Sequence, residues 1–462
     1  MIYSKTKSAK LLEGYALRAL FSGFNNKKIR YAVLRNYEKL PDRAGSRDID
    51  LLVHPKDMVK AKSVICTLVR DMDLLISDVF EDDMFFSIWL FKRLDEWLPF
   101  TLSIDLFPGR RIYGQELYSV EEALGKTRIY NGIPVVQEHF VYLDKVLYNL
   151  AVGQPTHKKY DILFADIVKS NRKLIIDTLA PFIGRNHAQY RIDATATGIA
   201  SSLPCMNRRK RIRMLLNGLV RRPISVLRGL TYFVAFRLRD QWKLRGLFLS
   251  ISGPDGSGKT TLINLVISQL EDIYGKDNIH YSHFRPTLLP RIAKVAKKVR
   301  AVKTVDENYN RPHRAKPSGR LGSLMRLGYY CLDYIFGYMR HVRPVVMRRE
   351  VMLFDRYYYD LIADSFRSRI SLPLYILRFI RLILPMPQYA FFIDVDPEEI
   401  HNRKQELTME RIVFLNKRYG NLSDRGWLIR TDNNGEPKIA AAAIVDHIVA
   451  DRDACGRKII GL

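Results

Sequence analysis

The sequence is poor in cysteine, short of acidic residues and without a long apolar run. Its four cysteines form no Cys-x-x-Cys or Cys/His pattern, so neither a disulfide framework nor a zinc site is expected. No stretch reaches the roughly 18 uncharged apolar residues that a membrane-spanning helix needs. Basic residues interrupt the apolar positions between Met1 and Phe21, which is not the pattern of a signal peptide. These absences favour a cytoplasmic protein.

The charge balance indicates an acidic partner. The 462 residues include 75 Lys and Arg against 48 Asp and Glu, which gives a formal net charge of +27. Such an excess suits a nucleotide, a nucleic acid or an anionic membrane surface, and charge alone does not choose among them. The length predicts about two to four domains. A content of 47% hydrophobic and 27% charged residues is typical of a folded protein.

A glycine-rich stretch carries the strongest functional signal. Residues 247–251 predict a short apolar strand, and residues 253–260 then spell G-P-D-G-S-G-K-T, a complete phosphate-binding P-loop pattern. The glycines let backbone N–H groups converge on a polyphosphate, and the helix that follows directs its positive dipole end at the anion. Lys259 is expected to reach the β and γ phosphates, and the Thr260 hydroxyl is expected to bind Mg²⁺. The predicted nucleotide-binding residues are Gly253, Asp255, Gly256, Ser257, Gly258, Lys259, Thr260 and Thr261.

A second apolar strand, residues 351–354, ends in Asp355-Arg356-Tyr357. Because the carboxyl ends of parallel strands gather at one edge of a sheet, this segment should lie beside the P-loop. Asp355 is therefore expected to hold Mg²⁺ or to accept a proton. Arg356 is expected to bind the acceptor's phosphate. A later strand, residues 390–395, leads into a helix with basic residues, including Arg403, that could close over a triphosphate.

These motifs resemble thymidylate kinase and the wider nucleoside-monophosphate kinase family over roughly residues 245–450. The resemblance implies a five-stranded parallel sheet flanked by helices, with ATP and Mg²⁺ as cofactors. It also implies that Asp255 approaches the acceptor sugar, that Arg285 and Tyr357 belong to the acceptor site, and that Arg403 contacts ATP. The family's R-E-P is F-R-P here, and a basic insertion at 290–318 has no counterpart in the short enzymes. Selection of thymine is therefore not implied.

The amino-terminal half has a second candidate site. In the stretch R-D-I-D-L-L-V, Asp48 and Asp50 are two residues apart on a predicted strand, so both carboxylates project from one face. A similar strand at 102–107 carries Asp105. Three carboxylates on neighbouring strands could hold two Mg²⁺ ions roughly 3.5–4 Å apart. An ordinary sheet with aspartates on its solvated face is the alternative interpretation.

This arrangement resembles the nucleotidyltransferase superfamily over about residues 28–165, in which an Asp-x-Asp strand is followed by a third carboxylate on a neighbouring strand. The resemblance implies an α+β domain with a helical tail. One departure concerns triphosphate binding, because the family's Gly-Ser pair is replaced by Leu34-Arg35-Asn36. Arg35 could take over that role.

The segment between Met206 and Gly246 is strongly basic and contains aromatic residues. It is interpreted as a domain linker whose apolar face packs on its own protein. Attachment to an anionic membrane surface is a second interpretation, and contact with nucleic acid is the least favoured. The predicted domains are a nucleotidyltransferase-like domain at 1–200, a basic amphipathic linker at 201–245 and a kinase-like domain at 246–462.

The predicted fold class is therefore α/β, with a P-loop kinase fold and an added α+β domain. The leading functional hypothesis is an ATP- and Mg²⁺-dependent phosphotransferase with a small-molecule acceptor, either a nucleotide or a sugar or glycan end. A nucleotidyltransferase acting through Asp48, Asp50 and Asp105 is the first alternative. A nucleotide-binding switch or scaffold without turnover is the second. Homodimer formation and peripheral attachment at the inner face of a membrane stay open.

Overall fold

The computed structural model describes residues 2–45, 48–82, 85–94, 99–112, 115–221, 223–224, 226–229, 231, 246–286, 319–404 and 407–462. The basic insertion at 290–318 and the aromatic-rich part of the linker from 232 onward lie outside the described residues. The chain forms two compact units. The first comprises Met1–Asp240 together with Ala450–Leu462, and the second comprises Gln241–Val449. No helix of the described residues is long and apolar enough to cross a membrane.

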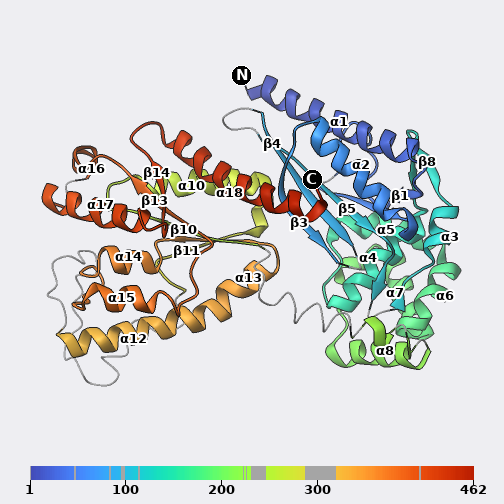
Figure 1. Cartoon of the computed structure of the whole chain (residues 1–462). Coiled ribbons are helices and arrows are strands. Elements are labelled where there is room, and N and C mark those ends of the chain that lie inside the picture. The colour runs from blue at the N-terminus through green and yellow to red at the C-terminus, as the bar shows by residue number, and fades with distance from the viewer. Residues whose placement is uncertain are drawn as a thin grey trace. The chain divides into compact units, whose positions relative to one another are not determined.

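The first unit contains a seven-stranded mixed sheet with helices on both faces (Figure 1). The strand order is β3-β4-β5-β2-β1-β9-β8. The strands are β1 Tyr31–Val33, β2 Asp48–Val53, β3 Leu75–Glu81, β4 Phe86–Arg93, β5 Pro99–Phe107, β8 Arg128–Tyr130 and β9 Ile133–Val135, with a separate β6 Arg111–Ile112 and β7 Gln115–Glu116 ribbon. The helices are α1 Ile2–Asn26, α2 Met58–Asp71, α3 Val120–Gly125, α4 Glu138–Val152, α5 Asp161–Ser170, α6 Arg172–Ile183, α7 Arg185–Ala196 and α8 Arg208–Arg221.

Alternation along β2 explains the two layers that cover this sheet. Leu51 belongs to a buried cluster with residues of α1 and α2, whereas its neighbour Leu52 belongs to a second cluster with residues of α4 to α7. Successive strand side chains point to opposite faces, so both faces of the sheet are buried. Asp48 and Asp50 share the face of Leu52. The strand β2 pairs in parallel with β5, with Asp50 directly opposite Asp105.

The second unit contains a five-stranded sheet in the order β11-β12-β10-β13-β14. Every neighbouring pair is parallel, which confirms the predicted five-stranded parallel sheet. The strands are β10 Leu247–Ser252, β11 Ile279–His283, β12 Val351–Asp355, β13 Tyr389–Asp394 and β14 Ile429–Asp432. The helices are α10 Lys259–Tyr274, α12 Arg320–Gly337, α13 Arg343–Met347, α14 Tyr358–Ala363, α15 Leu374–Ile380, α16 Pro397–Arg403, α17 Met409–Ser423 and α18 Pro437–Ile460.

Burial explains why the central strands β10 and β12 are largely apolar. All residues of β10 and β12 are buried, as expected for central strands of a parallel sheet whose two faces are covered by helices. Leu262, Val266 and Leu270 lie on the buried side of α10. The carboxyl ends of β10, β11 and β12 meet at one edge, where Ile251 and His283 both pair in register with Asp355.

The end of α18 packs on β3 within the first unit, although the sequence placed residues 246–462 in one domain. The backbone N–H of Ile76 donates to Asp453 Oδ1 over 2.8 Å, and Arg457 Nη2 donates to the Leu74 carbonyl over 3.0 Å. A Cβ atom on Gly456 would lie 2.6 Å from Ile76 Cγ2. The absence of a side chain at Gly456 is therefore what lets the helix approach the strand this closely.

Candidate functional site

The P-loop has the predicted strand–turn–helix form. The strand β10 ends at Ser252, and α10 begins at Lys259. Gly256 and Gly258 have φ angles of +95° and +77°, which residues with a side chain rarely adopt. Space is also limited, because a Cβ on Gly256 would lie 3.2 Å from the Ile400 carbonyl oxygen. The loop therefore depends on glycine at both positions for its backbone path.

Lys259 is buried at the start of α10. Its Nζ donates to the Pro254 carbonyl over 2.5 Å and to Ser257 Oγ over 3.5 Å, so the amine lies inside the curve of the loop. Burial and the charge of Arg356 together lower the pKa of Lys259 to about 7, although three nearby carboxylates oppose the shift. A phosphate bound in the loop would favour the charged form of this lysine, because an anion next to a buried amine offsets its lost hydration.

Asp355 lies at the sheet edge beside the loop. One of its oxygens, Oδ2, is 3.1 Å from His283 Nδ1 and accepts a hydrogen bond from the Tyr281 hydroxyl over 3.4 Å. The other, Oδ1, is buried and has no hydrogen-bond partner among the described residues. Burial by itself would raise the pKa of Asp355, but the His283 hydrogen bond and the charges of Arg356 and Lys259 keep it below its ordinary value.

This donor set fits Mg²⁺. Asp355 offers an ionised carboxylate with one uncommitted oxygen, and Thr260 offers an exposed hydroxyl in the first turn of α10. Mg²⁺ prefers oxygen ligands and keeps several waters, so two protein groups suffice to hold it next to phosphates. Sequence reasoning missed His283 and Tyr281. Both residues lie on β11, which runs beside β12 and ends at the same edge of the sheet. Their closeness to Asp355 depends on this pairing.

Arg356 occupies a buried network rather than the open surface. Its guanidinium donates to the Gly253 carbonyl and to Asp360 Oδ1 over 2.9 Å each, and to Asp255 Oδ1 over 2.6 Å. Burial opposes the charge, but Asp360 and Asp255 raise the pKa of Arg356 above its ordinary value. This arginine therefore fixes the P-loop to the end of β12. Arg367, which the sequence did not single out, also donates to Asp255, over 2.6 Å to Oδ2.

Asp360 is the centre of this network and was missed by sequence reasoning. It accepts hydrogen bonds from the Ser252 hydroxyl over 2.5 Å, from the Tyr419 hydroxyl over 2.6 Å and from the backbone N–H of Tyr357 over 3.2 Å, in addition to Arg356. The side chain of Asp360 is 2% exposed. These donors come from β10, α17 and the start of α14, so their convergence is a product of the tertiary fold.

The predicted acceptor residues divide into two environments. Arg285 forms an ion pair with Asp333 of α12 at 3.1 Å, and its guanidinium lies 4.6 Å from the ring centroid of Tyr330. Tyr357, in contrast, is fully buried and donates its hydroxyl to the Pro385 carbonyl over 3.0 Å. The structure places Tyr357 in the core of the unit, and Arg285 beside the tyrosines of α12.

Arg403 lies beside the last glycine of the loop, Gly258. A Cβ on Gly258 would lie 3.5 Å from Arg403 Nη1, so the guanidinium is adjacent to the start of α10. Arg403 also pairs with Glu399 one turn earlier in α16. Next to it, buried Asn433 donates to the Ser257 carbonyl over 3.0 Å. This contact joins the segment after β14 to the P-loop.

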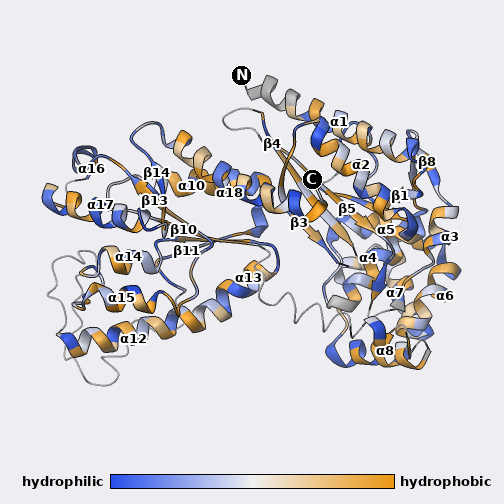
Figure 2. Ribbon diagram, in the orientation of Figure 1, coloured by the Kyte–Doolittle hydropathy of each residue, from blue (hydrophilic) through white to orange (hydrophobic). Residues whose placement is uncertain are grey.

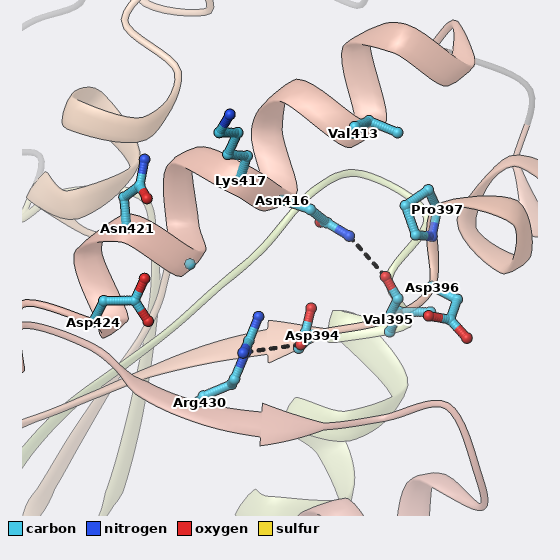
Figure 3. Close-up of a pocket in the computed structure, with 11 residues that line it drawn as sticks. Asp394, Val395, Asp396, Pro397, Val413, Asn416, Lys417, Asn421, Asp424 and Arg430 are labelled. Atoms are coloured by element: carbon cyan, nitrogen blue, oxygen red, sulfur yellow. Dashed lines mark hydrogen bonds and ion pairs between the residues drawn. The ribbon is translucent and has the colours of Figure 1, made fainter.

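A separate polar pocket lies between the ends of β13 and β14 and the helix α17 (Figure 3). Its volume is about 430 Å³. Arg430 pairs with Asp394 at 2.8 Å, and Asn416 donates to the Val395 carbonyl over 2.8 Å. None of the residues predicted from the sequence as site residues lines this pocket. It is therefore distinct from the P-loop site.

The first unit brings its three predicted carboxylates together. Asp48, Asp50 and Asp105 each offer an oxygen, and these oxygens lie within 4.8 Å of one another. The pKa of Asp50 is raised to about 7, because burial and the charges of Asp48, Asp105 and Asp144 outweigh the opposing charge of Arg35. A divalent cation would relieve this crowding of negative charge, so the donor set fits Mg²⁺.

Arg35 joins the carboxylates to a second buried group. Its Nε is 2.8 Å from Asp50 Oδ2, and its Nη1 is 3.4 Å from Asp144 Oδ2 in α4. Asp144 also pairs with Arg110. Arg35 thus connects the three carboxylates to a buried Asp144–Arg110 pair. The sequence suggested Arg35 as a replacement phosphate ligand, but it gave no sign of Arg110 or Asp144.

Comparison with known proteins gives a partial match. No protein-family model matches the chain. A probable thymidylate kinase from Pyrobaculum aerophilum is 24% identical over 208 residues, which cover 44% of this chain and 93% of that protein. A thymidylate kinase of known structure from Ehrlichia chaffeensis aligns with 17% identity over 44% of this chain and 98% of its own. The TM-score of that alignment is 0.31, which is too low to establish a common fold.

Proposed function

We propose that the second unit is an ATP- and Mg²⁺-dependent phosphotransferase of the nucleoside-monophosphate kinase type. One observation carries the proposal: the P-loop and Asp355 stand at the same edge of a parallel sheet, on the neighbouring strands β10 and β12. The partial sequence similarity to a thymidylate kinase supports it independently. A P-loop alone indicates only polyphosphate binding, whereas a carboxylate and several arginines beside it are what phosphoryl transfer requires.

The chemistry follows from the positions of these groups. Lys259 and the backbone N–H groups at the start of α10 would hold the β and γ phosphates. Mg²⁺ held by Thr260 and Asp355 would neutralise part of the triphosphate charge. The bond from the γ phosphorus to the leaving ADP oxygen breaks as a bond to the acceptor oxygen forms. Arg403, beside Gly258, is placed to stabilise the charge on the phosphates as the group moves.

The acceptor site is proposed on the other side of the loop, around Asp255 and Arg285. Asp255 already pairs with Arg356 and Arg367, so these two cations lie beside the position proposed for the acceptor. Arg285 with Tyr330 offers a positive charge next to an aromatic ring. Such a set suits a phosphorylated acceptor, either a nucleoside monophosphate or a sugar or glycan end that carries phosphate.

The direct test is ADP release from ATP and Mg²⁺ by the full chain, with dTMP, other nucleoside monophosphates and simple sugars as acceptors. Lys259→Met should lower the rate by about 10²-fold or more, because it removes the positive charge that stabilises the transferred phosphate. Lys276→Met, at an exposed lysine of the same unit, is the matched control and should leave the rate unchanged. An equal rate in Lys259→Met would refute a reaction at the P-loop. Tight ATP binding without ADP release on any acceptor would instead favour a switch or scaffold.

The first unit supports a second candidate function, metal-dependent nucleotidyl transfer. The observation that favours it is the meeting of the three carboxylates next to Arg35. Transfer of labelled nucleotide should then be lost in Asp105→Asn and retained in Lys259→Met. Asp71→Asn, at an exposed aspartate of α2, is the matched control. Retention of transfer in Asp105→Asn would refute this function without affecting the kinase proposal.

A further inference from the structure

The helix α8, Arg208–Arg221, leaves an apolar stripe uncovered. Met214 is 1% exposed and belongs to the helical core of the first unit, so α8 is anchored through that side. Ile212, Leu216 and Val220 are 48%, 53% and 84% exposed. Their spacing of four residues aligns them along one side of the helix. Figure 2 shows hydrophobic and hydrophilic positions intermixed along α8.

The stripe continues beyond the end of α8. The described residues that follow are also helical, and there Ile224 is 82% exposed and Leu227 is 53% exposed, while Val226 is buried. We call Ile212, Leu216, Val220, Ile224 and Leu227 the α8 stripe. Single exposed apolar residues are common on protein surfaces. Three on α8 at helical spacing and two on the described helical residues that follow, in a segment anchored by buried side chains, form an exposed apolar surface that favours an apolar contact.

The charge around the α8 stripe restricts the partner. The sequence has no acidic residue between Asp193 and Asp240. The basic residues up to Gly229 are Arg208, Arg209, Lys210, Arg211, Arg213, Arg221, Arg222 and Arg228. Arg209 and Arg213 are exposed, and their spacing from Leu216 and Val220 places them on the side of the stripe. A partner for this surface must be anionic and must also accept apolar side chains.

We propose that the α8 stripe docks the chain on an anionic phospholipid bilayer. An interfacial helix places its apolar side below the head groups and its arginines among the lipid phosphates. The apolar side chains are then removed from water, and the arginines are paired with negative charges. A nucleic acid would use the arginines and leave the stripe exposed. A second copy of the chain would set one row of cations against another. This inference concerns location and does not depend on the proposed catalytic function.

The test is flotation of the full chain with vesicles of phosphatidylcholine alone and with vesicles containing phosphatidylserine. Wild type should float with the anionic vesicles only. Val220→Glu should reduce the bound fraction by about tenfold or more, because it removes an apolar side chain that the bilayer would bury and adds a negative charge. Val59→Glu, at a valine of α2 that is 78% exposed, is the matched control and should bind as wild type.

A charge variant tests the arginines separately. Arg213→Glu changes the local charge by two units and should weaken binding by about 30-fold. Lys173→Glu makes the same change at an exposed position of α6 and should have little effect. Equal recovery of wild type from neutral and anionic vesicles would overturn the proposal. So would a concentration-dependent dimer that Val220→Glu disrupts in a chain that does not float, because the stripe would then be a contact between copies.

Discussion

Replacing Asp360 by alanine should destabilise the second unit severely. The carboxylate accepts four hydrogen bonds, from Ser252, Arg356, Tyr357 and Tyr419. Arg356 is only 4% exposed in its side chain, and the substitution would leave Asp255 as the remaining carboxylate of its two ion pairs. Removing one partner of a buried ion pair costs about 3–5 kcal/mol, because the other charge stays buried without compensation. The expected loss of unfolding free energy is therefore in this range.

Hydrogen exchange measured by mass spectrometry suits this prediction, because it reports on each unit of a two-unit chain separately. Amides of β10 and β14 should exchange about 10²- to 10⁴-fold faster in Asp360→Ala wherever exchange requires opening of the whole unit. Asp360→Asn retains one acceptor oxygen and should lose less. Asp277→Ala removes an exposed carboxylate of the same unit and serves as the control.

A loss of unfolding free energy below about 1 kcal/mol in Asp360→Ala, which is the magnitude of an exposed ion pair, would refute this prediction. That result would mean that Asp255, the Gly253 carbonyl and water compensate Arg356 fully. A further check uses Arg356→Met in the Asp360→Ala background. If the buried charge is the cause, removing it should restore part of the lost stability, whereas a purely steric effect of the first substitution would not be relieved.

Three further predictions concern other sites. Gly456→Ala should destabilise the packing of α18 on β3 by about 1–3 kcal/mol, which hydrogen exchange should show as faster exchange of the Ile76 amide. Gly125→Ala, where a Cβ meets open space, should leave that exchange unchanged. Since the pKa of Lys259 is about 7 without ligand, ATP binding at pH 8 should take up a proton, and calorimetry in two buffers of different ionisation enthalpy should show it; buffer-independent heats would contradict this. The pKa of Asp50 is raised from 3.8 to about 7, so its contribution to stability is present at low pH and is lost as the pH rises through about 7. In EDTA the first unit should therefore become less stable as the pH rises from 3.8 to about 7, and Asp50→Asn should abolish this pH dependence. Mg²⁺ should offset the loss, because a bound cation stabilises the ionised carboxylate.

Local features of the fold followed from the sequence because they depend on neighbouring residues. The P-loop could be predicted because glycines at fixed spacing permit positive φ angles whatever surrounds them. The joint projection of Asp48 and Asp50 followed from the two-residue repeat of a strand. The meeting of Asp105 with Asp50 needed the further assumption that β5 neighbours β2, which the pairing confirms. The parallel sheet of the second unit was implied by the resemblance to the nucleoside-monophosphate kinase family, and the strand pairing confirms it.

Contacts between distant segments could not be obtained in this way. The α8 stripe is apolar in the sequence, but only the packing of Met214 shows which side of the helix is covered. Asp144 and Arg110 are two ordinary charged residues until α4 brings them beside Arg35. Their roles depend on which helix packs against which strand, and a single sequence does not record that choice.

The sequence by itself determined the P-loop pattern at Gly253–Thr260, which predicts a polyphosphate site, and indicated that three carboxylates could share one face of a second sheet. The tertiary structure decided how each site is supported. It buried Arg356 and Tyr357, two residues of one motif expected to meet the acceptor, and it gathered Asp360, Arg367 and His283 from separate elements around the loop. The physical reason is that backbone conformation is set by local sterics, whereas burial and charge pairing are set by the whole packed chain.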